Sequence, residues 1–521
     1  MFWLVAPPGL EPGKTEPKSG VLPLHHGAIA QRRCEDKQRK VTSSTMEVRN
    51  FVDGALETTA AVLENVAPGS GEVYGTLPRS GAAEVDRAMA AATRAFPAWA
   101  ATPAAERAAC LDRLADAVKD HAAMLAEAEA RDNGKPVSLA SHVDIPRAEK
   151  NLRFYATGIQ HFASQSHAME GEAINYTLRK PLGVVACISP WNLPLYLFTW
   201  KVAPALAAGN CVVAKPSELT PVTAYLLSTW ISQAGFPPGV FNVLHGLGPG
   251  VGEAMVTHPD IAAVSFTGGT VTGARIAGHV APKFKKMSLE LGGKNPALIF
   301  ADADFDEALR TTLRSSFANQ GQICLCGSRI LIERPIYEKF RDALVAKASK
   351  MEAGDPLDPA TKMGAVVSED HMNKILGYIE LAREEGGRVL CGGQRVHPDG
   401  VENGFYIAPT VIEGLGPECR TNQEEIFGPV VTLQPFDTEA EALALANNTA
   451  YGLAATLWTS DLKRAHRVAS HIESGIVWVN TWLLRDLRTP FGGVKASGVG
   501  REGGFEALEF FTEPQNICIK L

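Results

Sequence analysis

The stretch GVVACISPWNLPLYLFTWKVAPALAAGNCVVAKPS, residues 183–217, holds two short apolar runs separated by a segment of helix length. The runs at 183–190 and 211–217 are rich in β-branched residues, as strands are. The segment between them starts after a turn at Trp191 and Asn192 and stops at Gly209, a residue typical of helix ends. A strand, a helix and a second strand in this order predict two parallel strands with the helix packed on one face of their sheet.

The same alternation extends in both directions from this stretch. Short β-rich runs recur at 240–246 and 262–269. Upstream, the spacing predicts a helix over 105–130, whose apolar face is formed by Leu111, Leu114, Val118, Ala122 and Leu125. This arrangement is typical of a nucleotide-binding α/β domain, although shape alone does not give function.

A second alternation follows from residue 295 onward. Strands are expected at 295–300, 329–333, 430–436 and 475–480, with helices at 304–317 and 335–350. We therefore predict a second α/β domain. The segment FANQGQICLCGSRI, residues 317–330, falls between a helix and a strand, where active-site residues of α/β proteins tend to lie.

Composition excludes several classes of protein. A chain of 521 residues is too long for one core, and 45% apolar with 21% charged residues is typical of a soluble protein. The net charge of -7 and the dispersed basic residues argue against nucleic acid or an anionic membrane as partner. No apolar run approaches the roughly 18 residues of a membrane span. We expect a cytoplasmic protein.

Residues 1–45 differ from the rest of the chain because they are rich in Pro, Gly and charge and have no helix or strand period. We expect a disordered or spuriously translated leader, with the natural start at Met46. A targeting peptide is the alternative.

Cys324 and Cys326 stand one residue apart in a chain of nine cysteines. An odd number spread over such a length indicates free thiols in a reducing compartment, which disfavours a disulfide. A metal site is disfavoured as well, because no second C-x-C, C-x-x-C or H-x-x-x-H completes one. A buried structural thiol and a reactive thiol remain.

Two glycine-rich turns each follow an expected strand. The first, HGLGPGVG at 245–252, fits G-x-G-x-x-G only superficially because the acidic residue expected about 20 positions later is missing. The second, SFTGGTVTG at 265–273, opens a helix whose N–H groups could meet a pyrophosphate. Each alone is more often a plain loop. We expect the two turns to follow adjacent strands of one sheet, and together they favour the binding of a dinucleotide.

Glu290 lies on an apolar strand in MSLELGGKNPALIF. A carboxylate in this setting is either paired and structural, or a base whose pKa is raised by burial. With Cys324 and the turn amide of Asn192, the sequence thus offers a candidate nucleophile, a candidate base and a hydrogen-bond donor.

These residues stand in motifs by which the chain resembles the aldehyde dehydrogenase superfamily. The resemblance runs from about Phe51 to the C-terminus, with the motifs in the family's order: SPWNLPL, KPSELTP, SFTGGTVTG, LELGGKNP, FANQGQICLCGSR, EEIFGPV and PFGGVKASGVGRE. It implies an α/β fold with a Rossmann-like NAD-binding domain (46–162 and 182–292), a catalytic domain (293–497) and a small β extension for oligomerisation (163–181 and 498–521). A homodimer or homotetramer is implied, joined through the segments INYTLRKPLG and FTEPQNICIKL.

The resemblance also implies roles for individual residues. Cys324 occupies the nucleophile's place and adds to the aldehyde carbon, while Cys326 is a structural neighbour. The amide of Asn192 and the backbone N–H of Cys324 stabilise the oxyanion, and Glu290 activates the water that releases the acid.

NAD is the implied cofactor, because the carboxylate of Glu218, paired with Lys215, suits ribose hydroxyls and repels a 2′-phosphate. Glu425 and Phe427 resemble the residues that hold the nicotinamide ribose and ring, and residues 268–273 approach the pyrophosphate. Gly269 stands where the family usually has Ser, so a contact to the nicotinamide end is in doubt. The full expected set is Ser189, Pro190, Trp191, Lys215, Glu218, Gly248, Thr267, Gly268, Gly269, Gly273, Leu291, Glu425 and Phe427.

The stretch WLLRDLRTPFGG, at 482–493, places Arg485 and Arg488 where many family members have apolar residues. With Arg147 in HVDIPRAEKNLRFYA it resembles the 2-aminomuconate and 2-hydroxymuconate semialdehyde dehydrogenases, whose substrates carry a carboxylate remote from the aldehyde. Arg147 and Arg485 would then anchor this carboxylate. Surface ion pairs for Arg488 and Arg153, and a plain helix-face charge for Arg147, are the alternatives.

Two other functions stay open. One is a general aldehyde dehydrogenase acting on betaine aldehyde, aliphatic aldehydes or retinal. The other is a binding protein that keeps the fold without activity, against which the intact set of Cys324, Glu290 and Asn192 argues.

Overall fold

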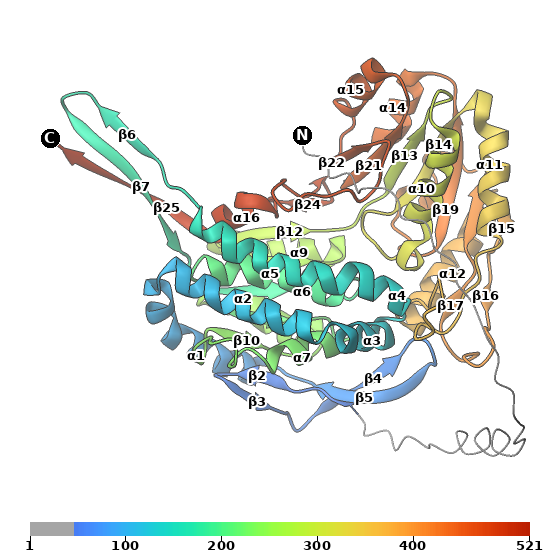
Figure 1. Cartoon of the computed structure of the whole chain (residues 1–521). Coiled ribbons are helices and arrows are strands. Elements are labelled where there is room, and N and C mark those ends of the chain that lie inside the picture. The colour runs from blue at the N-terminus through green and yellow to red at the C-terminus, as the bar shows by residue number, and fades with distance from the viewer. Residues whose placement is uncertain (1–45) are drawn as a thin grey trace, which may run out of the picture. The chain divides into compact units, whose positions relative to one another are not determined.

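The computed structural model describes residues 46–521, and the leader that we expect at 1–45 lies outside this part. Figure 1 shows the described chain as two α/β layers joined by crossing segments, with a thin three-stranded arm.

The first sheet is the predicted nucleotide-binding sheet. Among residues 46–521 it has eight strands, in the order β24 (Gly498–Val499), β12 (Lys286–Glu290), β11 (Ile261–Thr267), β8 (Val184–Ile188), β9 (Cys211–Lys215), β10 (Phe241–Val243), β2 (Asn50–Val52) and β3 (Ala55–Glu57). The five middle strands are parallel, and the pairings of β24, β2 and β3 are antiparallel. Every residue of β8 and β9 is buried, which explains their uninterrupted apolar sequence.

The expected adjacency of the two glycine-turn strands is wrong. β10 and β11 belong to one sheet, but β8 and β9 lie between them. The parallel part of the sheet begins at β8 and adds β9 and β10 on one side and β11 and β12 on the other, so order along the sequence does not give order in the sheet.

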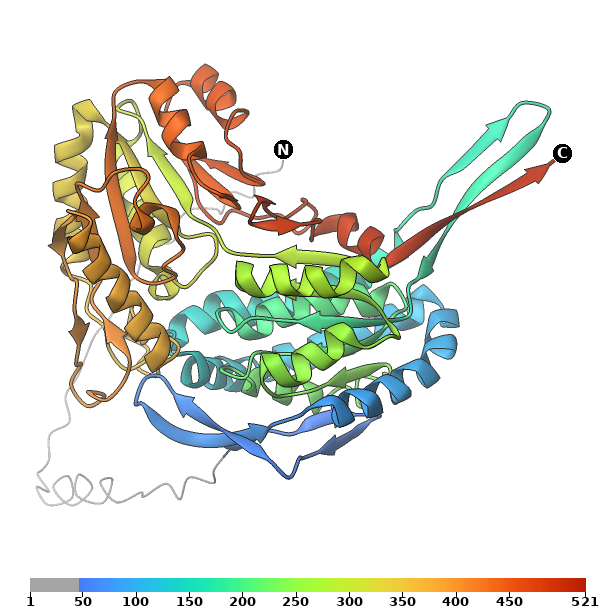
Figure 2. The same cartoon turned by 180° about the vertical axis from the view of Figure 1, so that it is seen from behind.

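Helices cover both faces of this sheet. On one face lie α2 (Ala104–Asp120), α3 (Ala122–Asn133), α5 (Ile145–Gln160) and α6 (Pro194–Ala207), as Figure 1 shows. On the other face lie α8 (Glu253–Thr257) and α9 (Thr270–Val280), visible in Figure 2. The single helix predicted over 105–130 is divided at His121, whose backbone leaves the helical region and whose ring stacks on Trp230 with 4.5 Å between centroids.

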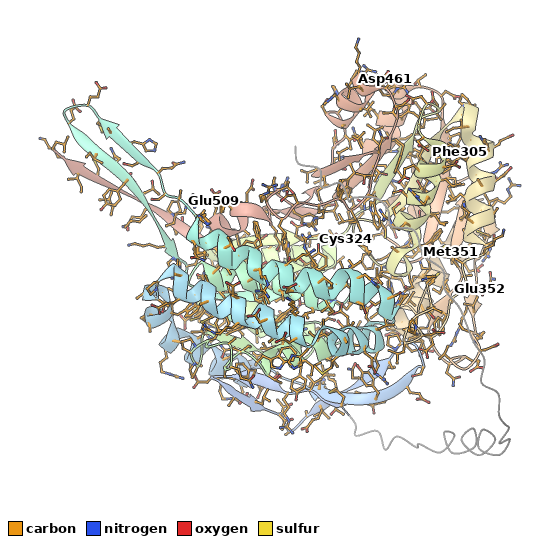
Figure 3. The ribbon with its side chains drawn as sticks, in the orientation of Figure 1. Phe305, Cys324, Met351, Glu352, Asp461 and Glu509 are labelled. Carbon is orange, nitrogen blue, oxygen red and sulfur yellow. The ribbon has the colours of Figure 1, made fainter. Side chains whose placement is uncertain are left out.

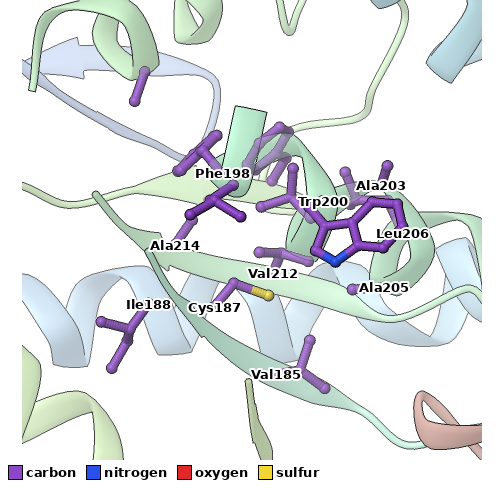
Figure 4. Packing of buried hydrophobic residues seen from close by; sticks show 14 of the residues in the cluster. Val185, Cys187, Ile188, Phe198, Trp200, Ala203, Ala205, Leu206, Val212 and Ala214 are labelled. Carbon is purple, nitrogen blue, oxygen red and sulfur yellow. The ribbon is translucent and has the colours of Figure 1, made fainter. Parts of the chain in front are cut away.

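The main core fills the space between β8, β9 and α6. Figure 4 shows Val185, Cys187, Val212, Phe198 and Trp200 packed together there. Because all of α6 is buried, its apolar residues occupy the whole circumference rather than one stripe. This rigid layer carries the Trp191–Asn192 turn at its edge.

The second sheet confirms the predicted second α/β layer. Within the described residues its seven strands run in the order β15 (Arg388–Cys391), β18 (Thr410–Glu413), β19 (Val430–Phe436), β14 (Gly327–Glu333), β13 (Asn295–Ile299), β21 (Ala454–Trp458) and β22 (Ile476–Val479). The pairings are parallel except at β15. The helices of this layer are α10 (Phe305–Phe317), α11 (Arg334–Ala348), α12 (Glu369–Glu384), α14 (Glu439–Asn447) and α15 (Leu462–Ala469).

A three-stranded sheet projects from the first layer, with β7 (Ala173–Pro181) between β6 (Ser166–Met169) and β25 (Thr512–Lys520) in the described chain. The segment 498–521, which we expect to serve oligomerisation, is divided by the structure. Its first part forms β24 in the first sheet and α16 (Gly504–Phe510), while β25 alone pairs with β7 along nine residues.

The 20-residue helix α1 (Ala82–Ala101) contacts β8 and β9 of the first sheet. The remaining elements are short: β1 (Met46–Glu47), β4 (Val62–Ala67), β5 (Glu72–Pro78), α4 (Val137–Leu139), η1 (Ala140–Asp144), α7 (Val222–Ser228), η2 (Gly248–Gly252), η3 (Ala281–Lys283), η4 (Ala318–Gly321), β16 (Arg395–Val396), β17 (Tyr406–Ile407), α13 (Arg420–Gln423), β20 (Tyr451–Gly452) and β23 (Val494–Lys495).

Candidate active site

The cysteine loop joins α10 to β14, as predicted, and Figure 3 places Cys324 where the two α/β layers meet. Asn319, Gln320 and Gly321 precede it in succession with φ of 51°, 55° and 70°. A left-handed backbone costs a residue other than glycine roughly 1–3 kcal/mol. The amide of Gln320 offsets part of this by donating to the carbonyl of Ala365 at 2.8 Å. The loop is thus a constrained support for the thiol.

Cys324 is half-buried and lines a cavity of about 540 Å³. Burial raises the pKa of its thiol, and the nearby carboxylates of Glu290 and Glu425 raise it further. Without a bound partner the thiol is therefore protonated at neutral pH. Cys326 is buried with its sulfur 3.9 Å from the carbonyl of Ala318, which fits the structural interpretation of this residue.

Asn192 lies in the turn between β8 and α6 and is buried beside the cysteine loop. Its side-chain Nδ2 donates to the carbonyl of Gln322, two residues before Cys324, at 3.0 Å. One amide hydrogen is used in this bond, and the second is available to an oxygen bound near the sulfur.

Glu290 ends β12 and lines the same cavity as Cys324. It is only 3% exposed, and its carboxylate oxygens find no hydrogen-bond partner among residues 46–521. Burial raises its pKa well above the ordinary value, and the charge of Glu502 adds to this rise. Of the two interpretations left open by the sequence, a paired structural carboxylate does not fit Glu290, because its oxygens have no partner among residues 46–521.

A buried ion pair next to Glu290 was missed by sequence reasoning. Lys201, fully buried in α6, donates to Glu502 at 2.7 Å and to Ser265 at 3.1 Å. Glu502 lines the cavity, and its second oxygen is without a partner in the described chain. Lys201 is the only charged residue in the long apolar segment 183–214, and this isolated charge could have indicated a buried ion pair. The sequence around Glu502 has no comparable feature.

Arg147 and Arg485 reach the cavity from α5 and from the loop after β22. The Arg147 guanidinium carbon lies 5.2 Å from the ring centroid of Tyr196 and 5.4 Å from that of Trp200. Its Nη2 is buried and lacks a hydrogen-bond partner within residues 46–521. Arg485 stacks on Phe491 at 4.0 Å. Two cationic groups on aromatic supports therefore face one cavity, and an anion would satisfy the open donor.

Arg488 and Arg153 behave as surface residues. Arg488 is exposed and pairs with Asp486 at 2.6 Å, and Arg153 pairs with Asp116 at 2.7 Å and with Glu149 at 2.7 Å. Their alternative interpretation as surface ion pairs is confirmed.

A cleft of about 380 Å³ opens at the ends of β8, β9 and β11 and brings together most of the expected cofactor residues. Both glycine turns reach it, although their strands are not adjacent. Its lining includes Ser189, Pro190, Trp191, Lys215, Glu218, Gly248, Thr267, Gly268 and Gly269.

The geometry of the cleft fits an extended phosphate-containing ligand. A Cβ at Gly248 or Gly269 would meet no described atom within 4 Å, so both turns leave open space beside the N-terminus of α9. Lys215 donates to Glu218 at 3.0 Å at the far end. Gly273 serves packing instead, since a Cβ there would lie 2.4 Å from a methyl carbon of Leu291.

A hollow of about 250 Å³ links the cleft to the thiol, lined by Trp191, Asn192, Leu291, Cys324, Glu425 and Phe427, among others. Glu425 accepts the backbone N–H of Gly293 at 2.8 Å. Phe427 has a φ of 61° and packs edge-on against Trp191, with 5.3 Å between centroids. Thr267, Leu291 and Cys324 also line the larger cavity.

Sequence reasoning missed His371, which completes this aromatic corner. Its Nε2 lies 2.7 Å from the carbonyl of Phe427, and its ring packs against Trp191 at 5.1 Å. Burial lowers its pKa to about 4, so the ring is neutral and can donate to that carbonyl.

Two features are absent from residues 46–521. No group of three His, Cys, Asp or Glu side chains is arranged to hold a metal ion. Likewise, none of the helices in this part combines the length and the apolar character that crossing a membrane requires.

Comparisons with known proteins agree with the geometry. The profile of the aldehyde dehydrogenase family matches residues 56–517. The 2-aminomuconic semialdehyde dehydrogenase of Bos taurus is 49% identical over 477 residues, covering 91% of this chain and 98% of that one. The 2-hydroxymuconic semialdehyde dehydrogenase of Pseudomonas sp. (strain CF600) is 47% identical over 484 residues, covering 91% and 100%. The NAD+ complex of an aldehyde dehydrogenase from Bacillus cereus superimposes with a TM-score of 0.89 at 39% identity, covering 91% and 97%.

Proposed function

Because the chain belongs to the aldehyde dehydrogenase family, we propose that it oxidises 2-aminomuconate or 2-hydroxymuconate 6-semialdehyde to the dicarboxylate, with NAD as oxidant. The observation that carries the substrate assignment is the presence of Arg147 and Arg485 in the same cavity as Cys324. Two guanidinium groups suit the carboxylate end of the substrate, and the thiol suits its aldehyde end.

In the first step the Cys324 thiol, protonated in the free protein, releases its proton to water, and the thiolate then adds to the aldehyde carbon, forming the C–S bond and placing a negative charge on the former carbonyl oxygen. The free amide hydrogen of Asn192 and the backbone N–H of Cys324 stabilise this oxyanion by roughly 3 kcal/mol per donor, by analogy with other oxyanion holes. The bond from Asn192 to the Gln322 carbonyl keeps the amide next to the cysteine loop.

Glu425 and Phe427 would hold the nicotinamide end of NAD next to the thiol, where NAD would supply the hydride acceptor for oxidation of the tetrahedral adduct to a thioester. Glu290 then removes a proton from the water that attacks the thioester carbon, the C–S bond breaks, and the acid and the thiol are released. Its raised pKa makes Glu290 a stronger base than an exposed carboxylate, and Glu502 with Lys201 tunes that pKa.

The cleft supports NAD as the cofactor. Gly248 and Gly269 leave open space in the cleft beside the N-terminus of α9, where a pyrophosphate would be held. The carboxylate of Glu218 suits two ribose hydroxyls and repels a 2′-phosphate, which favours NAD over NADP. Glu425 and Phe427, near the thiol, would hold the nicotinamide end.

The test is NADH formation by the full chain supplied with 2-hydroxymuconate semialdehyde generated in place from catechol. We expect turnover that is abolished in Cys324→Ala and a strongly raised KM in Arg485→Ala. A neutral aliphatic aldehyde is the comparison. Equal turnover of both substrates, unchanged by Arg485→Ala, would be compatible with the proposed oxidation of an aldehyde. It would refute the proposal that Arg147 and Arg485 bind the substrate carboxylate.

We further propose that the chain is a cytoplasmic homodimer or homotetramer joined through the arm. β25 leaves a nine-residue edge unpaired in the described chain, and Ile174, Leu178 and Ile519 are exposed on this arm. Cysteines that are free thiols throughout residues 46–521 suit a reducing compartment. Light scattering on the intact protein and on a variant ending at Phe511 tests the assembly, and an intact protein that is monomeric would contradict it.

A further inference from the structure

Lys135 is a fully buried charge just after α3, outside the set of residues that the proposed chemistry uses. Its ammonium group forms ion pairs with Asp144 and, at 3.4 Å, with Glu129. It also donates to the backbone carbonyl of Asn192 at 3.0 Å. Burying a lysine is unfavourable unless it is paired and hydrogen-bonded, so this arrangement of partners is specific.

The partners of Lys135 tie it to rigid elements. Asp144 ends η1, immediately before α5, and Glu129 accepts the backbone N–H of Leu195 at the start of α6 at 3.2 Å. Burial raises the pKa of Glu129 to about 8, and the positive charge of Lys135 opposes this rise. The ammonium group therefore has a fixed place relative to both helices.

The carbonyl of Asn192 lies in a turn, where it cannot join the strand ladder of β8. It receives two donors instead, Lys135 Nζ at 3.0 Å and Asn319 Nδ2 at 2.9 Å. One comes from the helical layer and the other from the cysteine loop. The peptide of Asn192 is thus held from both sides, and its side-chain amide is held by the bond to Gln322.

We infer that Lys135 is a positioning residue, which fixes the peptide of Asn192 so that the side-chain amide points at the oxyanion formed on Cys324. This inference rests on the proposed function, because it assumes that Asn192 stabilises that oxyanion. Hydrogen bonds that act on a transition state must be placed within about 0.5 Å, so a removed anchor lowers the rate even though it touches no substrate.

The test is a double-mutant cycle with p-nitrophenyl acetate, an activated ester that needs neither NAD nor the natural aldehyde. The Cys324 thiolate attacks the ester carbonyl, the acyl–sulfur bond forms and p-nitrophenolate leaves, so its release reports oxyanion stabilisation directly. We expect Asn192→Ala to lower this rate about 10²- to 10³-fold. Lys135→Met should lower it about 10- to 100-fold.

The double variant Lys135→Met/Asn192→Ala shows whether Lys135 positions Asn192 or has a general structural role. If Lys135 acts through the Asn192 amide, adding Lys135→Met to Asn192→Ala lowers the rate by no more than about twofold. If the double variant loses rate by the product of the two single-variant factors, Lys135 acts independently of the Asn192 amide, and the inference is overturned. Absence of Cys324-dependent ester cleavage in the wild type would overturn it as well.

Asp132→Asn is the matched control. Asp132 is buried near the end of α3, three residues before Lys135, but its carboxylate accepts from Asn65, Tyr74 and the N–H of Val222. We expect a lower melting temperature and an unchanged rate of ester cleavage. A rate loss equal to that of Lys135→Met would show that disturbance of α3 alone suffices, against the inference.

Lys135→Met leaves Asp144 buried without its partner, so this variant could fail to fold. A second variant keeps the test decisive in that case. Lys135→Met/Asp144→Asn removes both charges, a change that buried pairs often tolerate. It should show the same loss of ester cleavage and the same lack of further loss with Asn192→Ala. NADH formation from the muconate semialdehyde is measured separately, so a wrong substrate assignment leaves the outcome of the cycle intact.

Discussion

Arg485 donates a hydrogen bond from Nη1 to the hydroxyl of Tyr196, with 2.8 Å between the two atoms. The ring of the same tyrosine supports the guanidinium of Arg147. One aromatic side chain therefore orients both cationic groups that face the cavity, through its hydroxyl on one side and its ring on the other.

Tyr196→Phe keeps the ring and removes the hydroxyl, so it releases Arg485 and leaves Arg147 supported. We expect the KM for the semialdehyde acid to rise about three- to tenfold, because the lost hydrogen bond acts on the substrate only through Arg485 and is worth about 1 kcal/mol. The KM for a neutral aldehyde should stay unchanged. Arg488→Ala, which disrupts an exposed pair with Asp486, is the control and should alter neither value.

Glu290→Gln should separate the two halves of the reaction. Formation of the thioester does not need this base, so one equivalent of NADH should appear in a rapid burst. Hydrolysis does need it, and the steady-state rate should fall about 10²- to 10⁴-fold. Stopped-flow absorbance of NADH measures both phases. Loss of the burst together with turnover would mean that Glu290 acts before the thioester forms.

The pH dependence of hydrolysis should shift in opposite directions in two variants. Burial raises the pKa of Glu290, Glu502 raises it further, and Lys201 lowers it. A general base acts when deprotonated, so the rate falls as the pH drops through this pKa. Glu502→Gln should move the acidic limb of the profile to lower pH, and Lys201→Met to higher pH. Shifts in one common direction would contradict this electrostatic account.

Much of the fold was predictable because buried parallel strands have distinctive sequences, as in 184–188 and 211–215. The order of β8, β9, β10 and β11 was not, since each crossover helix can return on either side of the sheet. Cys324, Glu290 and Asn192 stand in recognisable motifs. Glu502 does not, because its place beside Lys201 depends on the chain returning at β24 to the edge of the first sheet. Lys135 was missed for a similar reason, as its partners come from separate helices.

Glu218→Ala should relax the choice of cofactor. The substitution removes the carboxylate that pairs with Lys215 and leaves the ammonium free to meet a 2′-phosphate. We expect kcat/KM with NADP to rise about 10- to 100-fold, the scale on which removed like-charge repulsion acts, while the value with NAD falls. Initial rates with each cofactor give the ratio. An unchanged ratio would place cofactor discrimination elsewhere in the cleft.

Gly269→Ser tests the position that departs from the family pattern. A Cβ fits there without contact to any atom of residues 46–521, and φ is -72°, so the change introduces no strain. The hydroxyl can cap α9, whose first residue is Thr270, and should stabilise the protein by about a few tenths of a kcal/mol. We expect a lower KM for NAD. A raised KM would show that the open space at Gly269 is itself needed by the cofactor.

The sulfur of Cys324 borders the large cavity on one side and the hollow leading to the cleft on the other. The lining of the large cavity includes the exposed residues His142 and Lys150. The lining of the cleft includes the exposed residues Thr272 and Arg275. If the dinucleotide binds in the cleft as proposed, the acid and the reduced dinucleotide have separate openings to solvent, and neither blocks the other. The order in which the two products leave is then set by the dissociation rate of each product. The acid can therefore depart while the dinucleotide is still bound.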